Sequence, residues 1–148
     1  MIFSCSQDRE VEEKTELYTQ SIQWDEFIDF REGNIPLLII SVHGGDIEPE
    51  WIKTRSCDGA TVVRDTHTLT VAKLIEYELN LLGYTPYIVL NDLHRKKLDL
   101  NRSLNNSNCG DQTTKPYWNL FHNQIDEFRT KIQNKYGAGL VIDIHGQS

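Results

Sequence analysis

The sequence lacks any long hydrophobic run, and this absence excludes one class of protein at the outset. Its longest apolar stretch is the eight residues IPLLIISV at positions 35–42. A helix that spans a membrane needs about 20 consecutive apolar residues. We therefore expect no membrane partner. The 39% apolar and 25% charged residues are typical of a globular protein.

Cysteine is also scarce. Cys5, Cys57 and Cys109 are odd in number and widely spaced, and none belongs to a C-x-x-C pair. This spacing is typical of reduced thiols in an intracellular protein, rather than of a disulfide framework or a cysteine zinc site. Residues 1–14 also lack the apolar core of a secretory signal. We expect free thiols and a cytoplasmic protein.

Basic residues are outnumbered. The 148 residues include 15 Lys and Arg against 22 Asp and Glu, which gives a net charge of −7. Proteins that bind nucleic acids or anionic membranes usually present a basic face, so we expect neither partner. A small acidic substrate stays compatible with this charge, because a few local arginines can override a weak overall field. A chain of this length is expected to form a single domain over residues 1–148.

Apolar segments alternate along the chain between strand-like and helix-like patterns. Continuous β-rich runs predict buried strands at 35–42, 85–90 and 138–146, and helical spacing predicts helices at 65–83 and 117–137. The lead-in segment, residues 1–34, carries no clear pattern. The β-α-β-α-β order predicts an α/β fold: a mainly parallel or mixed sheet with helices on both faces.

The ends of the predicted elements are also informative. Asp65 or Thr66 is the expected N-cap of the first helix, and Gly83 and Gly137 are expected to end the two helices. The apolar face of the first helix is predicted to consist of Leu69, Ala72, Leu74, Ile75, Leu79 and Leu82. Unless further strands follow it, the last strand is an apolar sheet edge, which predicts self-association.

Chemically capable side chains follow two of the predicted strands, in HGGD at residues 43–46 and DIHG at residues 143–146. Ligands of open α/β sheets bind beyond the carboxyl ends of the strands, so His43 and His145 should lie close together. Imidazoles and carboxylates bind zinc at about 2.0–2.2 Å, and Asp143 shares a strand face with His145 and can orient an imidazole. Each motif alone also fits a surface turn or an ordinary Asp–His hydrogen bond; their joint occurrence favours a metal site.

A third segment, HRKKLDLNRS at residues 94–103, lies in a long polar loop predicted over residues 91–115. A guanidinium beside an amide, as in Asn101 and Arg102, makes a planar fork for a carboxylate. Arg95 can polarise a carbonyl. The alternating leucines are expected to turn Asn101 inward, whereas a solvated basic loop is the alternative for the RKK part.

Taken in order, SVHGG, RDTHT, the R…DLNR segment, the H-x-x-I of His122 to Ile125 and DIHG resemble motifs of the N-formylglutamate amidohydrolase family. More distantly they are similar to those of the zinc carboxypeptidase and aspartoacylase group. The resemblance runs from about residue 37 to residue 148. It implies a phosphorylase/hydrolase-like fold, one Zn²⁺, and hydrolysis of the amide bond of an N-acyl (formyl-type) amino acid with a free carboxylate. The residues that it implies are His43, Asp46 and His145 as metal ligands, Asn101 and Arg102 as substrate-binding residues, and Arg95 as the catalytic arginine.

Two departures from the family pattern leave alternatives open. Position 46 carries aspartate where the distant relatives have the longer glutamate, and the acid in RDTHT makes Asp65 a rival third ligand unless it is a helix N-cap. The general-base glutamate of carboxypeptidase relatives follows the last ligand at a distance, and no residue up to Ser148 matches it. We therefore expect a C-terminally incomplete domain and assign no base. A divalent ion other than zinc fits equally.

Three hypotheses of function follow. The leading one is a metal-dependent hydrolase of carbon–nitrogen amide bonds. The second is a non-catalytic metal- or anion-binding remnant of the same fold, which the missing base motivates. The third is an interaction domain that uses exposed Trp51 and Tyr117.

Overall fold

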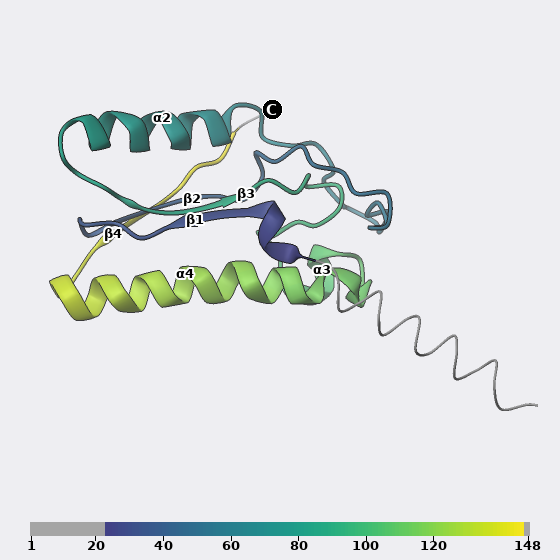
Figure 1. Cartoon of the computed structure of the whole chain (residues 1–148). Helices are drawn as coiled ribbons and strands as arrows, with labels where there is room; N and C mark the ends of the chain where they lie inside the picture. Colours follow the sequence, from purple (N-terminus) through teal and green to yellow (C-terminus); the bar gives the residue numbers. More distant parts are fainter. Residues whose placement is uncertain (1–22, 147–148) are drawn as a thin grey trace, which may run out of the picture.

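The computed structural model describes residues 23–146 and places a four-stranded sheet between helices on its two faces (Figure 1). The strands are β1 (Ile28–Arg31), β2 (Leu37–Ser41), β3 (Tyr87–Asn91) and β4 (Leu140–Asp143). The helical elements are η1 (Trp24–Phe27), α2 (Thr68–Leu81), α3 (Leu104–Ser107), η2 (Gln112–Thr114) and α4 (Lys115–Tyr136). The predicted α/β architecture is confirmed.

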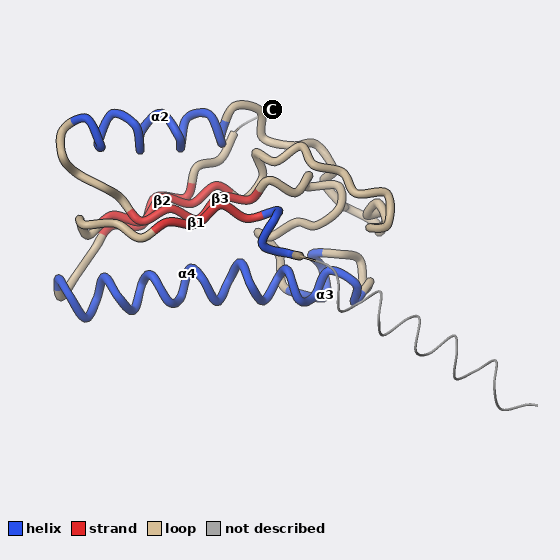
Figure 2. Tube along the Cα trace, viewed as in Figure 1, coloured by secondary structure: helices blue, strands red, loops and turns tan. Residues whose placement is uncertain are grey.

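The sheet has the strand order β1-β3-β2-β4. β2 runs parallel to both β3 and β4, whereas β1 pairs antiparallel with β3. The mixed sheet is as predicted, but the sequence pattern did not reveal β1, which comes from the lead-in segment; residues 1–22 of that segment lie outside the described residues. Because β2, β3 and β4 are parallel, their carboxyl ends meet at one edge, where the loops that follow β2 and β3 gather (Figure 2).

The core lies on both faces of the two central strands, β2 and β3. Alternate residues of β2 point to opposite sides: Leu38 packs in the cluster that contains Phe121 and Phe128 of α4, and Ile39 packs with Ala72 of α2. Every residue of β3 is buried. The predicted burial of these two strands is therefore confirmed. The loops that follow them begin from this buried part of the sheet.

The side chains of β4 and α2 are more exposed to solvent than the sequence predicts. Leu140 and Val141 of β4 are 59% and 44% exposed, so the prediction of a buried last strand is wrong. Among the described residues β4 pairs only with β2, so it is an edge of the described sheet. The predicted apolar face of α2 is correct for buried Ala72 and wrong for Leu74 and Leu82, because α2 packs on the sheet along one narrow side.

The helix ends agree with the sequence at their carboxyl termini only. Gly83 and Gly137 follow α2 and α4 with φ of 84° and 78°, a left-handed conformation that glycine adopts without strain. At the start of α2 the N-cap is His67, with no side-chain cap hydrogen bond. The prediction of Asp65 or Thr66 as the N-cap is therefore wrong, and the Asp65 carboxylate is left for another role.

Cys57 and Cys109 form a disulfide, so the prediction of free thiols is wrong for this pair. The reason is tertiary: the pair is 52 residues apart in sequence, yet the two Cα atoms lie 5.5 Å apart. A disulfide is not typical of a cytoplasmic protein, so the two cysteines do not support the predicted location, and Cys5 lies outside the described residues. No helix among residues 23–146 combines the length and apolar character that crossing a membrane requires.

Tyr117 is fully buried, and its hydroxyl oxygen lies 2.6 Å from the Phe27 carbonyl oxygen and 2.7 Å from Oδ1 of Asn91, two acceptors that share its single proton. The expectation of an exposed Tyr117 is wrong. Trp51 is 42% exposed and packs edge-on against Trp24. The interaction-domain hypothesis loses one of its two aromatic residues to the core.

Candidate metal centre

The carboxyl ends of β2 and β4 bring two histidines together, as the motif spacing predicts. His43 follows β2 by two residues, and His145 follows β4 by two residues. Their ring centroids lie 5.2 Å apart with an interplanar angle of 67°. Because the two strands are parallel neighbours, the pairing of Ile40 with Asp143 carries both histidines to the same rim.

Asp65 completes the cluster. Its Oδ2 lies 3.4 Å from Nδ1 of His43 and 3.4 Å from Nδ1 of His145. Ligand atoms of His43, Asp65 and His145 all lie within 4.8 Å of one another, a group that could hold a metal ion. Tetrahedral zinc with bonds of 2.0–2.2 Å requires ligand atoms roughly 3.3–3.6 Å apart. The two separations from the shared carboxylate oxygen meet this requirement.

Backbone hydrogen bonds hold Asp65 between the two histidine segments. The Asp65 amide donates to the carbonyl oxygen of His43 at 3.0 Å, and the Gly146 amide donates to Oδ2 of Asp65 at 3.0 Å. One residue thus ties together the loop after β2, the approach to α2 and the loop after β4. The acid in RDTHT was the signal for this role in the sequence.

The glycines of HGGD permit the close approach of these loops. A Cβ on Gly44 would meet the backbone nitrogen of Leu69 at 2.8 Å, and a Cβ on Gly45 would meet the backbone of Asp92 at 2.2 Å. Neither position has room for a side chain. His43 can leave β2 toward the cluster because the two residues after it fit against α2 and the segment after β3.

His43 is oriented by a buried carboxylate. Its Nε2 lies 2.7 Å from Oδ1 of Asp99, and the side chains of His43 and Asp99 are 1% and 0% exposed. Nδ1 of His43 is buried and has no hydrogen-bond partner among the described residues. An Asp99 bond to Nε2–H selects the tautomer whose Nδ1 carries a free lone pair. The orphaned nitrogen therefore faces the cluster in the form that binds a metal.

His145 repeats this arrangement at the sheet edge. Its Nε2 lies 2.9 Å from Oδ2 of Asp143, as the shared strand face predicts, and its Nδ1 faces Asp65. Each imidazole of the cluster thus has Nε2 held by its own carboxylate and Nδ1 directed to the common oxygen. This repetition fits a metal ligand set better than it fits two unrelated Asp–His pairs.

Asp46, the ligand implied by the resemblance, lies outside the cluster. Its side chain is 73% exposed, and its Oδ2 lies 3.0 Å from Nη1 of Arg64. The aspartate is directed to a surface guanidinium instead of to His43. Of the two rival third ligands, the structure brings Asp65, and not Asp46, together with the histidines.

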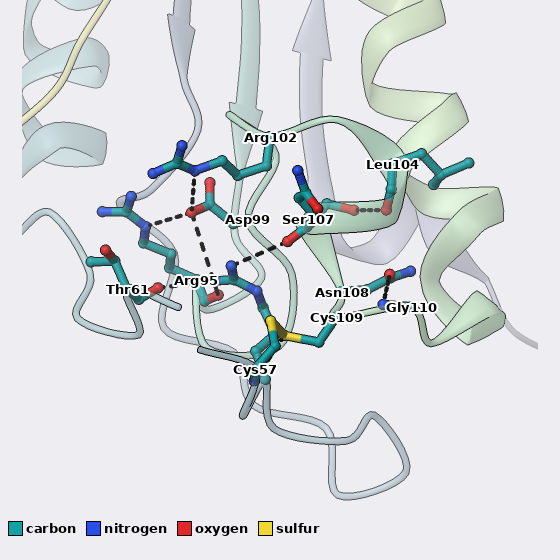
Figure 3. The surroundings of a disulfide bond; sticks show 12 residues. Cys57, Thr61, Arg95, Asp99, Arg102, Leu104, Ser107, Asn108, Cys109 and Gly110 are labelled. Carbon is teal, nitrogen blue, oxygen red and sulfur yellow. Dashed lines mark hydrogen bonds and ion pairs between the residues drawn. A yellow bond between two sulfur atoms is a disulfide. The ribbon is translucent and has the colours of Figure 1, made fainter. Parts of the chain in front are cut away.

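Arginines surround the carboxylate of Asp99 (Figure 3). Oδ2 of Asp99 lies 3.1 Å from Nε of Arg95, 3.6 Å from Nη1 of Arg55 and 3.9 Å from Nε of Arg102. Burial by itself would raise the pKa of Asp99, but the hydrogen bond with His43 and the charge of Arg95 hold it well below the usual carboxyl range. Asp99 is therefore an anion that faces His43.

Arg95 connects both carboxylates of the site. Besides its contact with Asp99, its Nη1 lies 3.4 Å from Oδ1 of Asp65. The resemblance predicted a role for Arg95, and the structure places it next to Asp65 of the candidate metal site. The sequence did not predict that Asp99 would orient His43 or that Arg55 would lie beside Asp99. Burial of the Arg55 guanidinium lowers its pKa. A buried carboxylate in DLNR was the available signal for Asp99.

The predicted carboxylate fork is only half oriented toward the site. Asn101 is exposed, and its backbone amide donates to Oδ1 of Asp99, so the prediction that Asn101 turns inward is wrong. The Arg102 side chain is 55% exposed, which leaves its guanidinium accessible to a solute. His94 lies apart from the cluster, with Nε2 3.6 Å from Oε1 of Glu48.

A cavity of about 370 Å³ opens beside the cluster. Its lining includes Asp65 and Gly146 from the metal centre, the two arginines Arg64 and Arg95, and Thr61. This volume falls in the range of small-molecule sites. An anionic solute in the cavity would therefore meet guanidinium groups next to the three candidate ligands.

Comparisons of the chain with family models, with curated proteins and with solved structures find no match. The geometry of the site is therefore the basis for a proposed function.

Proposed function

We propose that the chain is a metal-dependent amidohydrolase, with Zn²⁺ as the expected ion, that cleaves the amide bond of an N-acyl amino acid with a free carboxylate. One observation carries the proposal. Nδ1 of His43, Oδ2 of Asp65 and Nδ1 of His145 converge on one point, and the Nε2 of each histidine is held by a carboxylate. The ligand set comprises His43, Asp65 and His145.

The chemistry of the donor set supports zinc. Two neutral imidazoles and one carboxylate are a common three-ligand set of catalytic zinc sites, which keep one position open for water or substrate. A zinc ion in such a site lowers the pKa of the water that it binds to about 7 and polarises carbonyl groups. The protein itself supplies the orientation of the ligands, through Asp99 on His43 and Asp143 on His145.

The arginines would bind and polarise the substrate. Arg95 lines the cavity next to Asp65 and is the group to stabilise negative charge that develops on the amide carbonyl oxygen. Removal of such a donor typically costs about 10²–10³ in rate. Arg102, with its exposed guanidinium, is the group to pair with the free carboxylate. Water then adds across the C–N bond, and the products are a carboxylic acid and a free amino group.

A non-catalytic metal-binding remnant is the second candidate, and one observation favours it. No glutamate lines the cavity within the described part of the chain. Glu48 pairs with Lys96, and Glu127 pairs with Lys131. The group that would accept a proton from water is thus unassigned, and metal binding without turnover is the outcome that this candidate predicts.

Metal content tests the site. We expect about one zinc per chain by elemental analysis of metal-replete protein, and almost none in the His43→Ala/His145→Ala variant. His94→Ala is the matched control, because His94 lies on the same rim but outside the cluster. Zinc retained by the double variant would contradict the site.

Activity then separates the two candidates. Metal-replete protein is assayed on N-formyl and N-acetyl derivatives of acidic amino acids, with release of the free amino group as the readout. Hydrolysis that the double histidine variant loses and His94→Ala keeps supports the amidohydrolase. Stoichiometric zinc without hydrolysis supports the remnant.

A further inference from the structure

The Cys57–Cys109 disulfide joins two loops beside the metal centre. Cys57 belongs to the irregular segment 53–64, and Cys109 follows α3 in the segment 103–110 (Figure 3). We call them the cavity loop and the α3 loop. The cavity loop contributes Thr61, Val63 and Arg64 to the lining of the cavity. The disulfide therefore connects a wall of the cavity to the segment that continues from Asp99 and Arg102.

The middle of the cavity loop has few other attachments. From Ser56 to Val63, the described hydrogen bonds that leave the loop come from Cys57 alone, whose amide donates to Sγ of Cys109 at 3.2 Å. The internal bond from Nη1 of Arg55 to the Thr61 carbonyl oxygen, at 2.8 Å, closes the loop on itself. Among the described residues, this part of the wall is thus attached to the rest of the protein directly through the Cys57–Cys109 pair and indirectly through Arg55.

Arg55 transmits that connection to the metal centre. Its guanidinium is buried and donates to the carbonyl oxygens of Arg95 and Asn106 at 3.3 Å and 3.4 Å, and Nη1 lies 3.6 Å from Oδ2 of Asp99. Asn106 belongs to the α3 loop. Arg55 and the disulfide, two residues apart in the cavity loop, therefore hold the same pair of loops around the carboxylate that orients His43.

We infer that the Cys57–Cys109 disulfide is a redox switch for this site: the oxidised form clamps the cavity loop and keeps Asp99 on His43, and the reduced form loosens both. The inference rests on the proposed metal-binding function. Cys57 is exposed and Cys109 is half-buried, so a solution thiol can reach the bond. Its reducibility follows from this access.

The redox step requires a dithiol. One thiolate of the dithiol attacks one cysteine sulfur, which forms a mixed disulfide and releases the other cysteine as a thiol. The second thiolate of the dithiol then displaces the remaining cysteine and closes a cyclic disulfide. Two electrons and two protons pass from the dithiol to the protein, and the products are two cysteine thiols and the oxidised dithiol.

The test compares zinc affinity in the oxidised wild type and in the Cys57→Ser/Cys109→Ser variant, with Cys5→Ser as the control. The serine pair represents the opened state without free thiols that could bind zinc themselves. We expect the affinity of the serine pair to fall about 10-fold, the lower end of the effect of losing an outer contact to a metal ligand, and Cys5→Ser to match the wild type. Equal affinities of the oxidised wild type and the serine pair would overturn the inference.

Hydrogen exchange of the metal-free protein provides a second, independent measurement. Wild type reduced with a dithiol, and then freed of it under anaerobic conditions, is compared with oxidised wild type. We expect faster exchange over residues 53–64 on reduction, and recovery on reoxidation. If the oxidised wild type binds no zinc, the proposed function fails. Hydrogen exchange alone then tests whether the disulfide holds the cavity loop in place. Unchanged exchange over residues 53–64 on reduction would overturn this, and faster, reversible exchange would support it. The reversible arm also covers a serine pair that fails to fold.

Discussion

The two halves of the candidate metal centre are built alike and differ in burial. The side chains of His43 and Asp99 are 1% and 0% exposed, whereas those of His145 and Asp143 are 34% and 38% exposed. In the first half, the Asp99 carboxylate is surrounded by Arg55 and Arg95. In the second half, Asp143 and His145 lie at the carboxyl end of β4, the edge strand next to β2.

This difference indicates where the affinity of the site should originate. A hydrogen bond between a carboxylate and an imidazole is stronger where the local dielectric is low, and in water it is weakened by solvent and salt. Asp99 should therefore orient His43 tightly, and Asp143 should orient His145 loosely. We expect the buried half to set the metal affinity and the exposed half to complete the coordination.

Loss of the group that both halves share should have the largest effect. Asp65→Asn removes the negative charge between the two Nδ1 atoms while it keeps the shape of the side chain. Because Asp65 is a proposed ligand, the zinc affinity should fall by more than the roughly 10–100-fold that the loss of an outer partner costs. Calorimetric zinc titration measures this. Asp46→Asn, a control at an exposed position of the same rim, should bind as the wild type does; a reversed order would restore Asp46 as the ligand.

The second prediction sharpens the comparison directly. Asp99→Asn should reduce the zinc affinity about 10–100-fold, and Asp143→Asn should reduce it less than about 10-fold, because solvent already weakens the exposed pair. The same titration measures both variants. Thermal unfolding of the metal-free proteins separates loss of affinity from loss of fold, since Asn at 99 leaves buried Arg55 without a charged partner and leaves Arg95 with Asp65 alone. Equal losses in the two variants would show that burial does not divide the site.

The smallest effect concerns the exposed half and its strand. Val141→Lys places a charge on exposed edge strand β4 and should shift a self-associating sample toward monomer, because edge strands pair through unpaired backbone N–H and C=O groups and a lysine opposes such pairing. Light scattering measures the molar mass. Leu74→Lys, at an exposed apolar position on α2, is the control and should leave association unchanged. If only Leu74→Lys shifts the sample toward monomer, the self-association contact lies on α2.

Much of the fold was predictable because its signals are local. The buried strands β2 and β3 appear as continuous apolar runs, and α4 appears as apolar residues at helical spacing that end at Gly137. The position of the two histidines after parallel strands followed from the same reading. β1 was not predictable, since its short segment is stabilised by antiparallel pairing with β3 and carries no strong pattern of its own.

The candidate site was predictable in its histidines and in Arg95, and less so in its acids. HGGD placed Asp46 next to His43 in sequence, but the chain turns it outward to Arg64. The choice of Asp65 depends on backbone hydrogen bonds to His43 and Gly146, which join positions far apart in the chain. The spacing of residues along the sequence cannot predict such long-range contacts.

The amino-acid sequence by itself determined the strands and helices of the core and the rim at which His43 and His145 emerge, because hydrophobic periodicity and chain direction are properties of short segments. Only the tertiary structure decided that Asp65 joins them, that Asp99 orients His43, and that Cys57 meets Cys109. These contacts connect loops whose paths depend on how both faces of the sheet pack. Their partners are therefore selected by the whole fold.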